Sequence, residues 1–306
     1  MPSTRRPSTA RGPRSSPDGA GGQGARRPPA RPSRQTRRGR GRRSDLLARI
    51  LVAVPAAVVV IVLIDLGGLA WAIFLIVIGA VCLHELYRML GRWKPVPLVG
   101  FAALVGMVLA ARFAGHRQVL EVAAGVLPVL FAVLLARGQR ERLTLSVAST
   151  LLGIWWIAFA VAHAELLRRL PHGGAVLIDV LAGTFLADTA AYLGGRLFGR
   201  RLLAPTISPG KTVEGLFCGV LVAFLTLFLA GLLQNTWMTQ GHALALGLAV
   251  AVLGPLGDLF ESAIKRDAHI KDTGSLFRAH GGALDRADAA LFTVLGSYYI
   301  WFAIVH

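Results

Sequence analysis

The stretch GDLFESAIKRDAHIKDTGSLFRAHGGALDRAD at residues 257–288 decides the fold, because apolar sequence flanks it on both sides. Before it lies LALGLAVAVLGPL at 244–256, and after it lies AALFTVLGSYYIWFAIV at 289–305. Such apolar runs predict membrane-spanning helices. A loop that only joined two helices would need few residues, yet this one carries charges of both signs, as metal and phosphate sites do. The sequence therefore predicts chemistry at a membrane surface.

Three polar blocks follow one another in the second half of the chain. Two of them are ADTAAYLGGRLFGR at 187–200 and SPGKTVEG at 208–215. The third lies within the quoted stretch and consists of Ser262, Lys265, Arg266, Lys271, Asp272, Gly274, His280, Gly281, Gly282, Asp285, Arg286 and Asp288. In this order the blocks resemble the recurring motifs of the phosphatidate cytidylyltransferase family, which makes CDP-diacylglycerol. The resemblance covers roughly residues 45–306, with specific motifs only from about residue 187 onward.

Composition divides the chain into two parts. Of its 306 residues 54% are hydrophobic, which exceeds the apolar content of ordinary globular domains and favours a bilayer environment. Residues 1–44 differ, because they hold thirteen Arg, no Lys and one acid, Asp18, among many Pro, Gly and Ser residues. This segment cannot bury enough apolar surface to offset its ordering entropy. We expect a disordered cytoplasmic tail at 1–44 and an integral membrane domain at 45–306, with the motifs at 187–306.

The hydropathy pattern predicts an all-α polytopic membrane protein with about nine transmembrane helices. A span needs about 20 mostly apolar residues. Nine runs approach this length, at 47–64, 68–87, 97–114, 119–136, 144–166, 176–194, 213–233, 243–264 and 287–305. Lys and Arg concentrate in cytoplasmic loops, and the even-numbered spans are followed by basic loops. This pattern predicts a cytoplasmic N-terminus, an outer C-terminus and both motif loops on the cytoplasmic face of a bacterial-type inner membrane.

The third block places several polar groups on one face of a helix. Asp258, Glu261, Ser262 and Lys265 stand at positions i, i+3, i+4 and i+7. Ionisable groups at bilayer depth are costly, so they should face the bundle interior or a polar cavity. The plainer interpretation is a structural ion pair between Glu261 and Lys265, and on this helix alone the two interpretations are about equally favoured.

The family resemblance assigns roles to these residues. It implies Mg²⁺ held by Asp258 and Asp285, and leaves open a second, monovalent cation. Catalytic candidates besides these two are Glu261, Lys265 and Arg286. The resemblance further implies that CTP and phosphatidate are bound by Asp188, Ser208, Lys211, Thr212, Glu214, Ser262, Arg266, Lys271, Asp272, His280, Gly281 and Gly282. Other expected partners are membrane lipid and, with the oligomeric state open, a second copy of the chain.

Two neighbouring motifs are less specific than they look. Ser208–Thr212 contains Gly-Lys-Thr, but a P-loop needs a glycine where Pro205 stands, so we expect a cytoplasmic turn broken by Pro209. A second His-Gly-Gly at 172–174 lies on the predicted outer side without acids nearby and is expected to be an ordinary turn. Two departures from the family pattern are Gly210, where a lysine is usual, and Arg278-Ala279, where Pro-Gly is common.

Three other functions compete with this one. Intramembrane charges also mark ion paths in transporters and channels, but such sites lie near the bilayer midplane, whereas most charges here cluster at span ends. A lipid kinase or a CDP-alcohol phosphotransferase is the nearest enzymatic rival, and the sequence lacks a DGxxAR-type phosphotransferase motif.

The Arg-rich tail has no interleaved aromatic residues for base stacking, so no nucleic-acid partner is expected.

Overall fold

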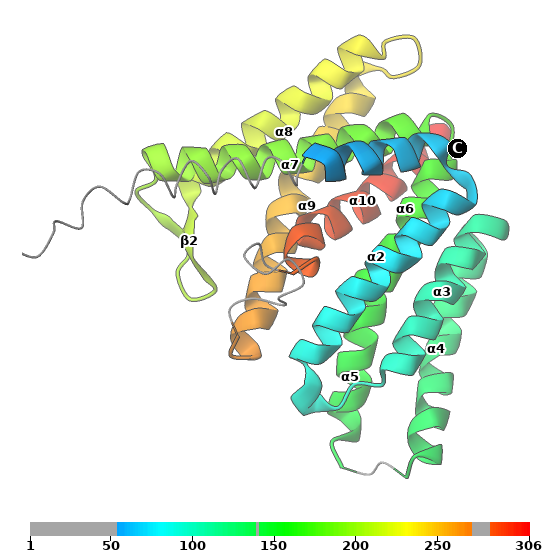
Figure 1. Ribbon diagram of the computed structural model, residues 1–306. Coiled ribbons are helices and arrows are strands. Elements are labelled where there is room, and N and C mark those ends of the chain that lie inside the picture. The colour runs from blue at the N-terminus through cyan, green and yellow to red at the C-terminus, as the bar shows by residue number, and fades with distance from the viewer. Residues whose placement is uncertain (1–53, 139–140, 271–281) are drawn as a thin grey trace, which may run out of the picture. The chain divides into compact units, whose positions relative to one another are not determined.

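The computed structural model describes residues 54–138, 141–270 and 282–306. Nearly all of this part is helical (Figure 1). The helices are Val54–Leu66, α2 Gly68–Met89, α3 Pro97–Phe113, α4 His116–Ala136, α5 Leu143–Gly153, α6 Phe159–Arg169, α7 Gly173–Phe198, α8 Val213–Leu233, α9 Gln240–Asp267 and α10 Leu284–Val305. A 3₁₀ turn, Gly91–Trp93, precedes α3, and a π-helical turn, Ile154–Ala158, joins α5 to α6. The chain is an all-α polytopic membrane protein.

The predicted spans coincide with helices. Seven helices in the described part of the chain are long and apolar enough to cross a membrane, and α5, the π-helical turn and α6 together form one of them. The first and third predicted spans fall on two shorter apolar helices, Val54–Leu66 and Pro97–Phe113. The count of nine therefore stays a prediction. The predicted tail and four predicted site residues, Lys271, Asp272, His280 and Gly281, lie outside the described residues.

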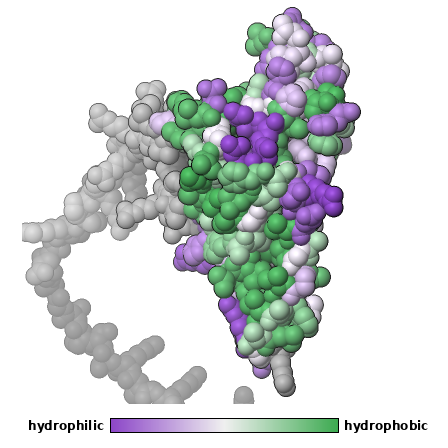
Figure 2. Space-filling view, turned by 90° about the vertical axis from the view of Figure 1, so that its right-hand side faces the viewer, coloured by the Kyte–Doolittle hydropathy of each residue, from purple (hydrophilic) through white to green (hydrophobic). Residues whose placement is uncertain are grey.

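Large apolar side chains cover much of the outer surface of these helices. Leu127, Val129 and Phe131 of α4 are about half exposed, and Leu233 of α8 is 86% exposed. Figure 2 shows wide apolar areas on the face that it presents, interrupted by separate groups of hydrophilic residues. Contiguous apolar surface of this extent is costly in water but suits hydrocarbon. The surface therefore fits an integral membrane protein.

The connections between helices gather into two sets. In one set, Arg92 before α3 donates to the Asp267 carbonyl oxygen at 2.5 Å, and Arg142 before α5 donates to the Arg92 carbonyl at 2.8 Å. Arg266, at the end of α9, donates to the carbonyl of Ile207 at 3.1 Å. We call these connections, at 90–96, 137–138, 141–142, 199–212 and 268–270, the motif-side loops. All of them were expected on the cytoplasmic face.

The second set joins the other ends of the helices. Arg168 donates to the carbonyl oxygens of Ile64 at 2.5 Å and Asp65 at 3.0 Å. The indole of Trp301 donates to the Pro171 carbonyl at 2.8 Å, and the His172 ring stacks on Trp237 at 4.2 Å between centroids. His172 lies in the short connection from α6 to α7, so the turn expected at 172–174 includes His172, whereas Gly173 and Gly174 already begin α7. The second set thus contains the loops expected outside.

A two-stranded antiparallel hairpin stands where a simple turn was expected. Strand β1, Leu202–Ala204, pairs with β2, Ser208–Thr212, between the ends of α7 and α8 (Figure 1). The expectation of a turn at 208–212 is wrong, because these residues form strand β2. Pro209 is tolerated within β2 because the free edge of this strand needs no N–H donor. Glu214 secures the hairpin base by accepting from the backbone N–H groups of Arg200 and Arg201, at 2.9 and 3.2 Å.

Candidate active site

The site is built where the backbones of α9 and α10 approach each other closely at Gly257. A Cβ atom on Gly257 would lie 2.6 Å from the backbone oxygen of Asp288, so only glycine fits at this crossing. The close approach places the last turns of α9 beside the first turns of α10. Glu261, Lys265, Asp285 and Asp288 lie on these turns.

Lys265 links the two helices at the centre of the site. Its ammonium group lies 2.8 Å from Glu261 Oε2 on α9 and 2.9 Å from Asp285 Oδ1 on α10. The three side chains are 16%, 2% and 16% exposed. Asp285 Oδ2 also accepts from the backbone N–H of Gly282 at 2.8 Å. The ion pair expected within α9 is therefore present, and it extends to a second helix.

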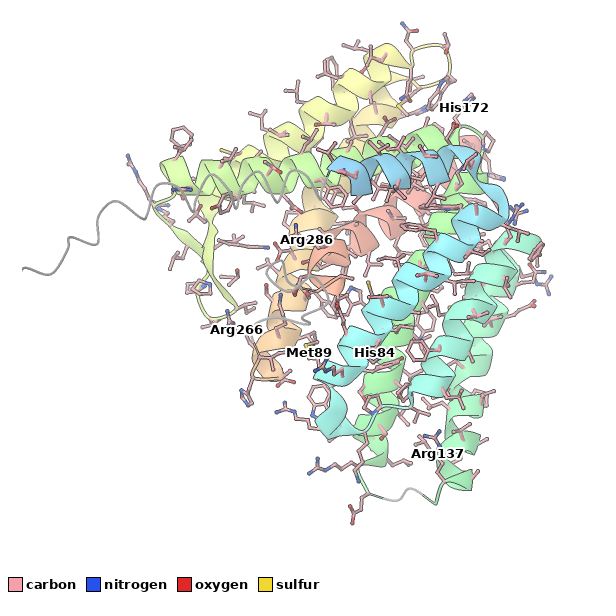
Figure 3. All side chains as sticks on the ribbon, in the orientation of Figure 1. His84, Met89, Arg137, His172, Arg266 and Arg286 are labelled. Atoms are coloured by element: carbon pink, nitrogen blue, oxygen red, sulfur yellow. The ribbon has the colours of Figure 1, made fainter. Side chains whose placement is uncertain are left out.

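The hairpin supplies a second lysine to the same region. Lys211 Nζ of β2 lies 2.5 Å from Asp258 Oδ2 of α9, with both side chains partly buried. Ser262 lies one turn further along α9, with its hydroxyl oxygen 3.5 Å from Asp258 Oδ1. Arg266 holds the hairpin from the other end through Ile207, as described above. Figure 3 shows Arg266 beside the hairpin tip and Arg286 at the start of α10.

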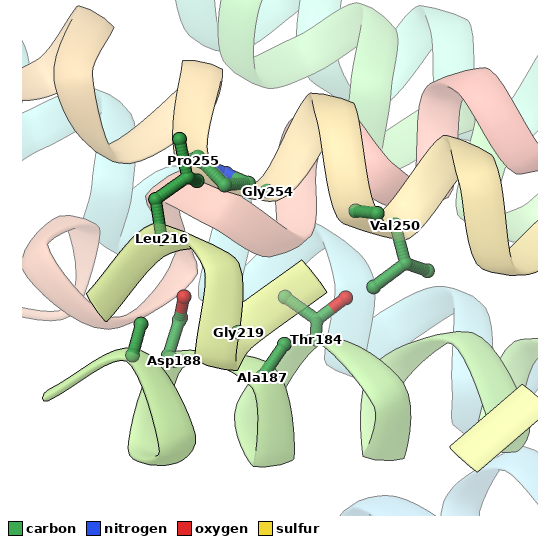
Figure 4. A pocket seen from close by; sticks show the side chains of 10 residues that line it. Thr184, Ala187, Asp188, Leu216, Gly219, Val250, Gly254 and Pro255 are labelled. Atoms are coloured by element: carbon green, nitrogen blue, oxygen red, sulfur yellow. The ribbon is translucent and has the colours of Figure 1, made fainter. Parts of the chain in front are cut away.

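Asp188 of α7 borders the site from a third direction. It interacts electrostatically with Asp258 and Lys211. It is also the only ionisable residue among those lining a small pocket between α7, α8 and α9 (Figure 4), since the other lining side chains are small or apolar. Pro255 lies at this pocket within α9, where its ring removes one helical hydrogen bond. The family resemblance had placed Asp188 among the substrate-binding residues, which stays a prediction, and the structure gives it Asp258 as a neighbour.

Several predicted substrate-binding residues have structural contacts. Thr212 caps α8, with its hydroxyl oxygen accepting from the Gly215 N–H at 3.1 Å, and Ser208 pairs with Ala204 across the hairpin. Glu214 is partly exposed and engages the hairpin backbone. These contacts do not test whether the same residues also bind substrate, so their predicted roles stay predictions.

Two further acidic residues join the site: Asp288, which belongs to the third motif block and was a further metal-ligand candidate, and Glu85, which had not been assigned to the site from the sequence. Asp288, 7% exposed, interacts electrostatically with Asp258 and lies next to Glu261. Glu85 of α2, 4% exposed, accepts from the backbone N–H of Leu284 at 2.9 Å. Glu85 lies far before the motifs in the sequence. The signal that points to it is an ionisable residue inside a predicted span, which is a functional candidate by default.

The donor set suits a hard divalent cation. Six carboxylates surround the site, from Glu85, Asp188, Asp258, Glu261, Asp285 and Asp288. The ion pairs among them involve two lysines, Lys211 and Lys265. Carboxylate oxygens are the ligands that Mg²⁺ takes, and an acidic excess can accept anionic substrates only with added positive charge. Within residues 54–138, 141–270 and 282–306, the His, Cys, Asp and Glu side chains form no group of three or more that could hold a metal ion as they stand.

Comparison with known proteins places this site in a family. The model of the cytidylyltransferase family matches residues 47–304. Phosphatidate cytidylyltransferase of Bacillus subtilis (strain 168) is 33% identical over 266 residues, covering 84% of this chain and 97% of that protein. Its counterpart in Staphylococcus aureus (strain COL) is 30% identical, covering 80% and 95%. Uncharacterized protein YnbB of Escherichia coli (strain K12) is 43% identical over 151 residues, or 47% of this chain and 50% of that protein.

The family match and the bacterial relatives both extend over the helices that carry the site and the helices before them. The resemblance inferred from three short motifs therefore holds over most of the chain. This protein belongs to the cytidylyltransferase family.

Proposed function

We propose that this protein is a phosphatidate cytidylyltransferase, which transfers CMP from CTP to phosphatidate and thereby makes CDP-diacylglycerol for phospholipid biosynthesis. An oxygen of the phosphatidate phosphate attacks the α-phosphorus of CTP. The bond from that phosphorus to the oxygen bridging to the β-phosphate breaks, and pyrophosphate leaves. The alignments with the two relatives that carry this name cover nearly the whole length of those proteins, which supports the assignment. The observation that carries it is the meeting of Lys265 with Glu261 and Asp285 beside the Lys211–Asp258 pair.

The protein's part in this reaction is positioning and charge neutralisation. Negative charge gathers on the phosphates in the transition state, and cationic groups fixed in a partly buried site stabilise it. Lys265, Arg266 and Arg286 would hold the two anionic substrates from α9 and α10, with Lys211 contributing from the hairpin. Lys271 and the His-Gly-Gly segment belong to the same proposal. Because Lys211 and Lys265 are already paired with carboxylates, substrate phosphates would compete for them.

Asp258 and Asp285 would hold Mg²⁺, with Glu261 and Asp288 as the nearest further oxygen donors. The metal ion supplies charge stabilisation to the phosphates of CTP when it is bound. A monovalent cation beside it is a further part of the proposal. The carboxylates of the site support a bound cation, since without one they would repel the phosphates of CTP.

We further propose nine spans with the N-terminus and the motif-side loops in the cytoplasm of a bacterial cell. The separation of the loops into two contacting sets supports nine crossings, because α3 begins in one set and ends in the other. Val96, which precedes α3, donates to Thr150 Oγ1 at 2.8 Å, and Ala111 near its end accepts from Arg169. CTP is a cytosolic metabolite, so a cytidylyltransferase requires this orientation.

A direct assay tests the activity. Purified protein in detergent receives CTP labelled in its α-phosphate, phosphatidate and Mg²⁺, and the label is followed into the lipid fraction together with pyrophosphate release. We expect both products in equal amounts and no transfer when the metal is chelated. A parallel reaction with diacylglycerol and CTP labelled in its γ-phosphate separates this enzyme from a lipid kinase, which would transfer that label to the lipid. Transfer of the γ-label to diacylglycerol, or no transfer of the α-label to phosphatidate, would contradict the proposal.

A further inference from the structure

Glu85 connects the helices before the motifs to the helix that carries two of the site's aspartates. Its Oε2 accepts from the backbone N–H of Leu284, the first residue of α10, at 2.9 Å. The two residues are 199 positions apart in the chain. Glu85 lies on the penultimate turn of α2 and is only 4% exposed. A buried carboxylate in a membrane helix is costly and therefore needs a physical reason.

The reason lies at the start of α10, where backbone N–H groups need a hydrogen-bond acceptor. The first four N–H groups of a helix have no partner within the helix, and Ser, Thr, Asp or Asn usually satisfies one of them from the N-cap position. Here the N-cap residue is Ala283, which makes no side-chain cap. Glu85 provides the missing acceptor from another helix. Its negative charge at a helix N-terminus is favoured by the helix dipole, and hydrogen bonds to a charged acceptor are stronger than neutral ones.

The capped residue directly precedes Asp285. A shift or fraying of the first turn of α10 would move the Asp285 carboxylate relative to Lys265, to which it is bonded at 2.9 Å. It would also move Asp288, whose backbone oxygen packs against Gly257 of α9. Misplacing catalytic groups by about 1 Å can cost on the order of a hundredfold in rate. The position of this one turn therefore matters for the whole site.

We propose that Glu85 is a positioning residue for cytidylyl transfer, acting through the N-terminus of α10 to hold Asp285 and Asp288 in register with α9. This inference rests on the proposed function and extends it to a helix that carries none of the three motifs. The alternative is that Glu85 binds metal or substrate itself. Its second oxygen, Oε1, is buried and receives no hydrogen bond from the described residues, so the two roles need separate tests.

Three variants of Glu85 separate these roles. Glu85→Gln keeps an oxygen for the Leu284 N–H but removes the charge, whereas Glu85→Asp keeps the charge but withdraws it by one methylene. Glu85→Leu removes both. A positioning role predicts that Gln retains kcat/KM within about threefold, while Asp and Leu lose about tenfold or more, which corresponds to about 1.4 kcal/mol per factor of ten. If Glu85 instead binds metal or substrate directly, Glu85→Asp should retain a higher kcat/KM than Glu85→Gln.

Hydrogen exchange gives a readout that does not depend on activity. We expect the amides of residues 284–288 to exchange faster in Glu85→Leu and Glu85→Asp than in the original protein, and to stay protected in Glu85→Gln. Glu165 on α6 offers a matched control, since it is 1% exposed, pairs with Arg112 and lies near the second set of loops, away from the motif-side loops. Glu165→Gln should leave α10 exchange and the Mg²⁺ concentration for half-maximal activity unchanged, even if it lowers the melting temperature.

Either of two results would overturn the inference: Glu85→Gln as inactive as Glu85→Leu with normal α10 protection, or Glu85→Leu as active as the original protein. Should Glu85→Leu fail to fold, the Gln and Asp variants still decide the question. If the original protein makes no CDP-diacylglycerol, the proposed function fails, while the exchange experiment continues to report on the cap.

Discussion

Lys265 links the two helices of the site, because it contacts a carboxylate on α9 and a carboxylate on α10. It contacts the carboxylates of both Glu261 and Asp285, and all three side chains are largely removed from solvent. Removing one partner from a buried ionic group is far more damaging than the pair is stabilising, because uncompensated charges remain. The site therefore depends on this ammonium group for both its structure and its charge balance.

Replacing Lys265 by Met tests this dependence, since Met fills similar space without charge. We expect a lower melting temperature, consistent with a cost of about 3–5 kcal/mol for a broken buried pair, and at least a hundredfold loss of CDP-lipid formation. Arg117→Met is the matched control. It removes an ion pair of the same i,i+4 spacing, Arg117–Glu121 at 2.9 Å, whose side chains are 86% and 59% exposed. Exposed pairs contribute little, so equal damage from both variants would contradict the account.

Residue spacing along the sequence predicted part of this arrangement. Glu261 and Lys265 were expected on one helical stripe because they are four residues apart, and they do form a pair. The bond from Lys265 to Asp285 could not be predicted this way, because it depends on how α9 and α10 cross. Glu214 shows the same limit, since its contact with the Arg200 and Arg201 amides arises only once the hairpin exists.

At the scale of elements, the crossing of α9 and α10 sets the geometry. Gly257 allows the backbones to meet at the level of Asp288, one turn before Glu261. The hairpin adds Lys211 from outside the bundle, and α2 adds Glu85 from the first half of the chain. The helices themselves were predictable from apolar runs, whereas their contacts were not, because hydropathy carries no information on which faces pair.

Gly257→Ala probes the crossing. Alanine is favoured over glycine within a helix by about 1 kcal/mol, so a loss must come from the contact. A Cβ at Gly257 would lie 2.6 Å from the Asp288 oxygen, and we expect α10 to shift, with at least a tenfold fall in kcat/KM. Gly254→Ala on the same helix is the control, because its nearest neighbour, Thr293 Cγ2, lies 3.6 Å away. If Gly257→Ala retained full activity, close helix approach would not be required.

At the scale of the molecule, the site lies among connections from one end of the helices. The charge distribution along the sequence anticipated this division of loops, since each expected cytoplasmic loop is basic. Contacts between distant loops, such as Arg92 with Asp267, agree with that division. The number of crossings stays a prediction, because the described parts of Val54–Leu66 and Pro97–Phe113 are shorter than a usual span and the first of them begins where the described residues begin.

Cysteine labelling tests the orientation. In a variant with Cys82 and Cys218 replaced by alanine, a single cysteine is introduced at one of two positions. These are Gly210 of the hairpin, in the motif-side loops, and Asn235, in the second set of loops. A membrane-impermeant maleimide added to intact cells should label Asn235→Cys and leave Gly210→Cys unlabelled until the membrane is opened. The reverse pattern would place the motif-side loops outside the cell.

If the carboxylates of α9 and α10 form the site of cytidylyl transfer, removing them should stop the transfer of labelled CMP from CTP into lipid. This transfer is measured for Asp258→Asn, Asp285→Asn and the control Asp267→Asn, whose side chain is 63% exposed at the end of α9. We expect transfer to fall at least a hundredfold in the first two variants, because a neutral amide is a much weaker Mg²⁺ ligand, and to persist in the third. Transfer near the original rate by Asp258→Asn or Asp285→Asn, in protein that inserts normally, would contradict this assignment of the site.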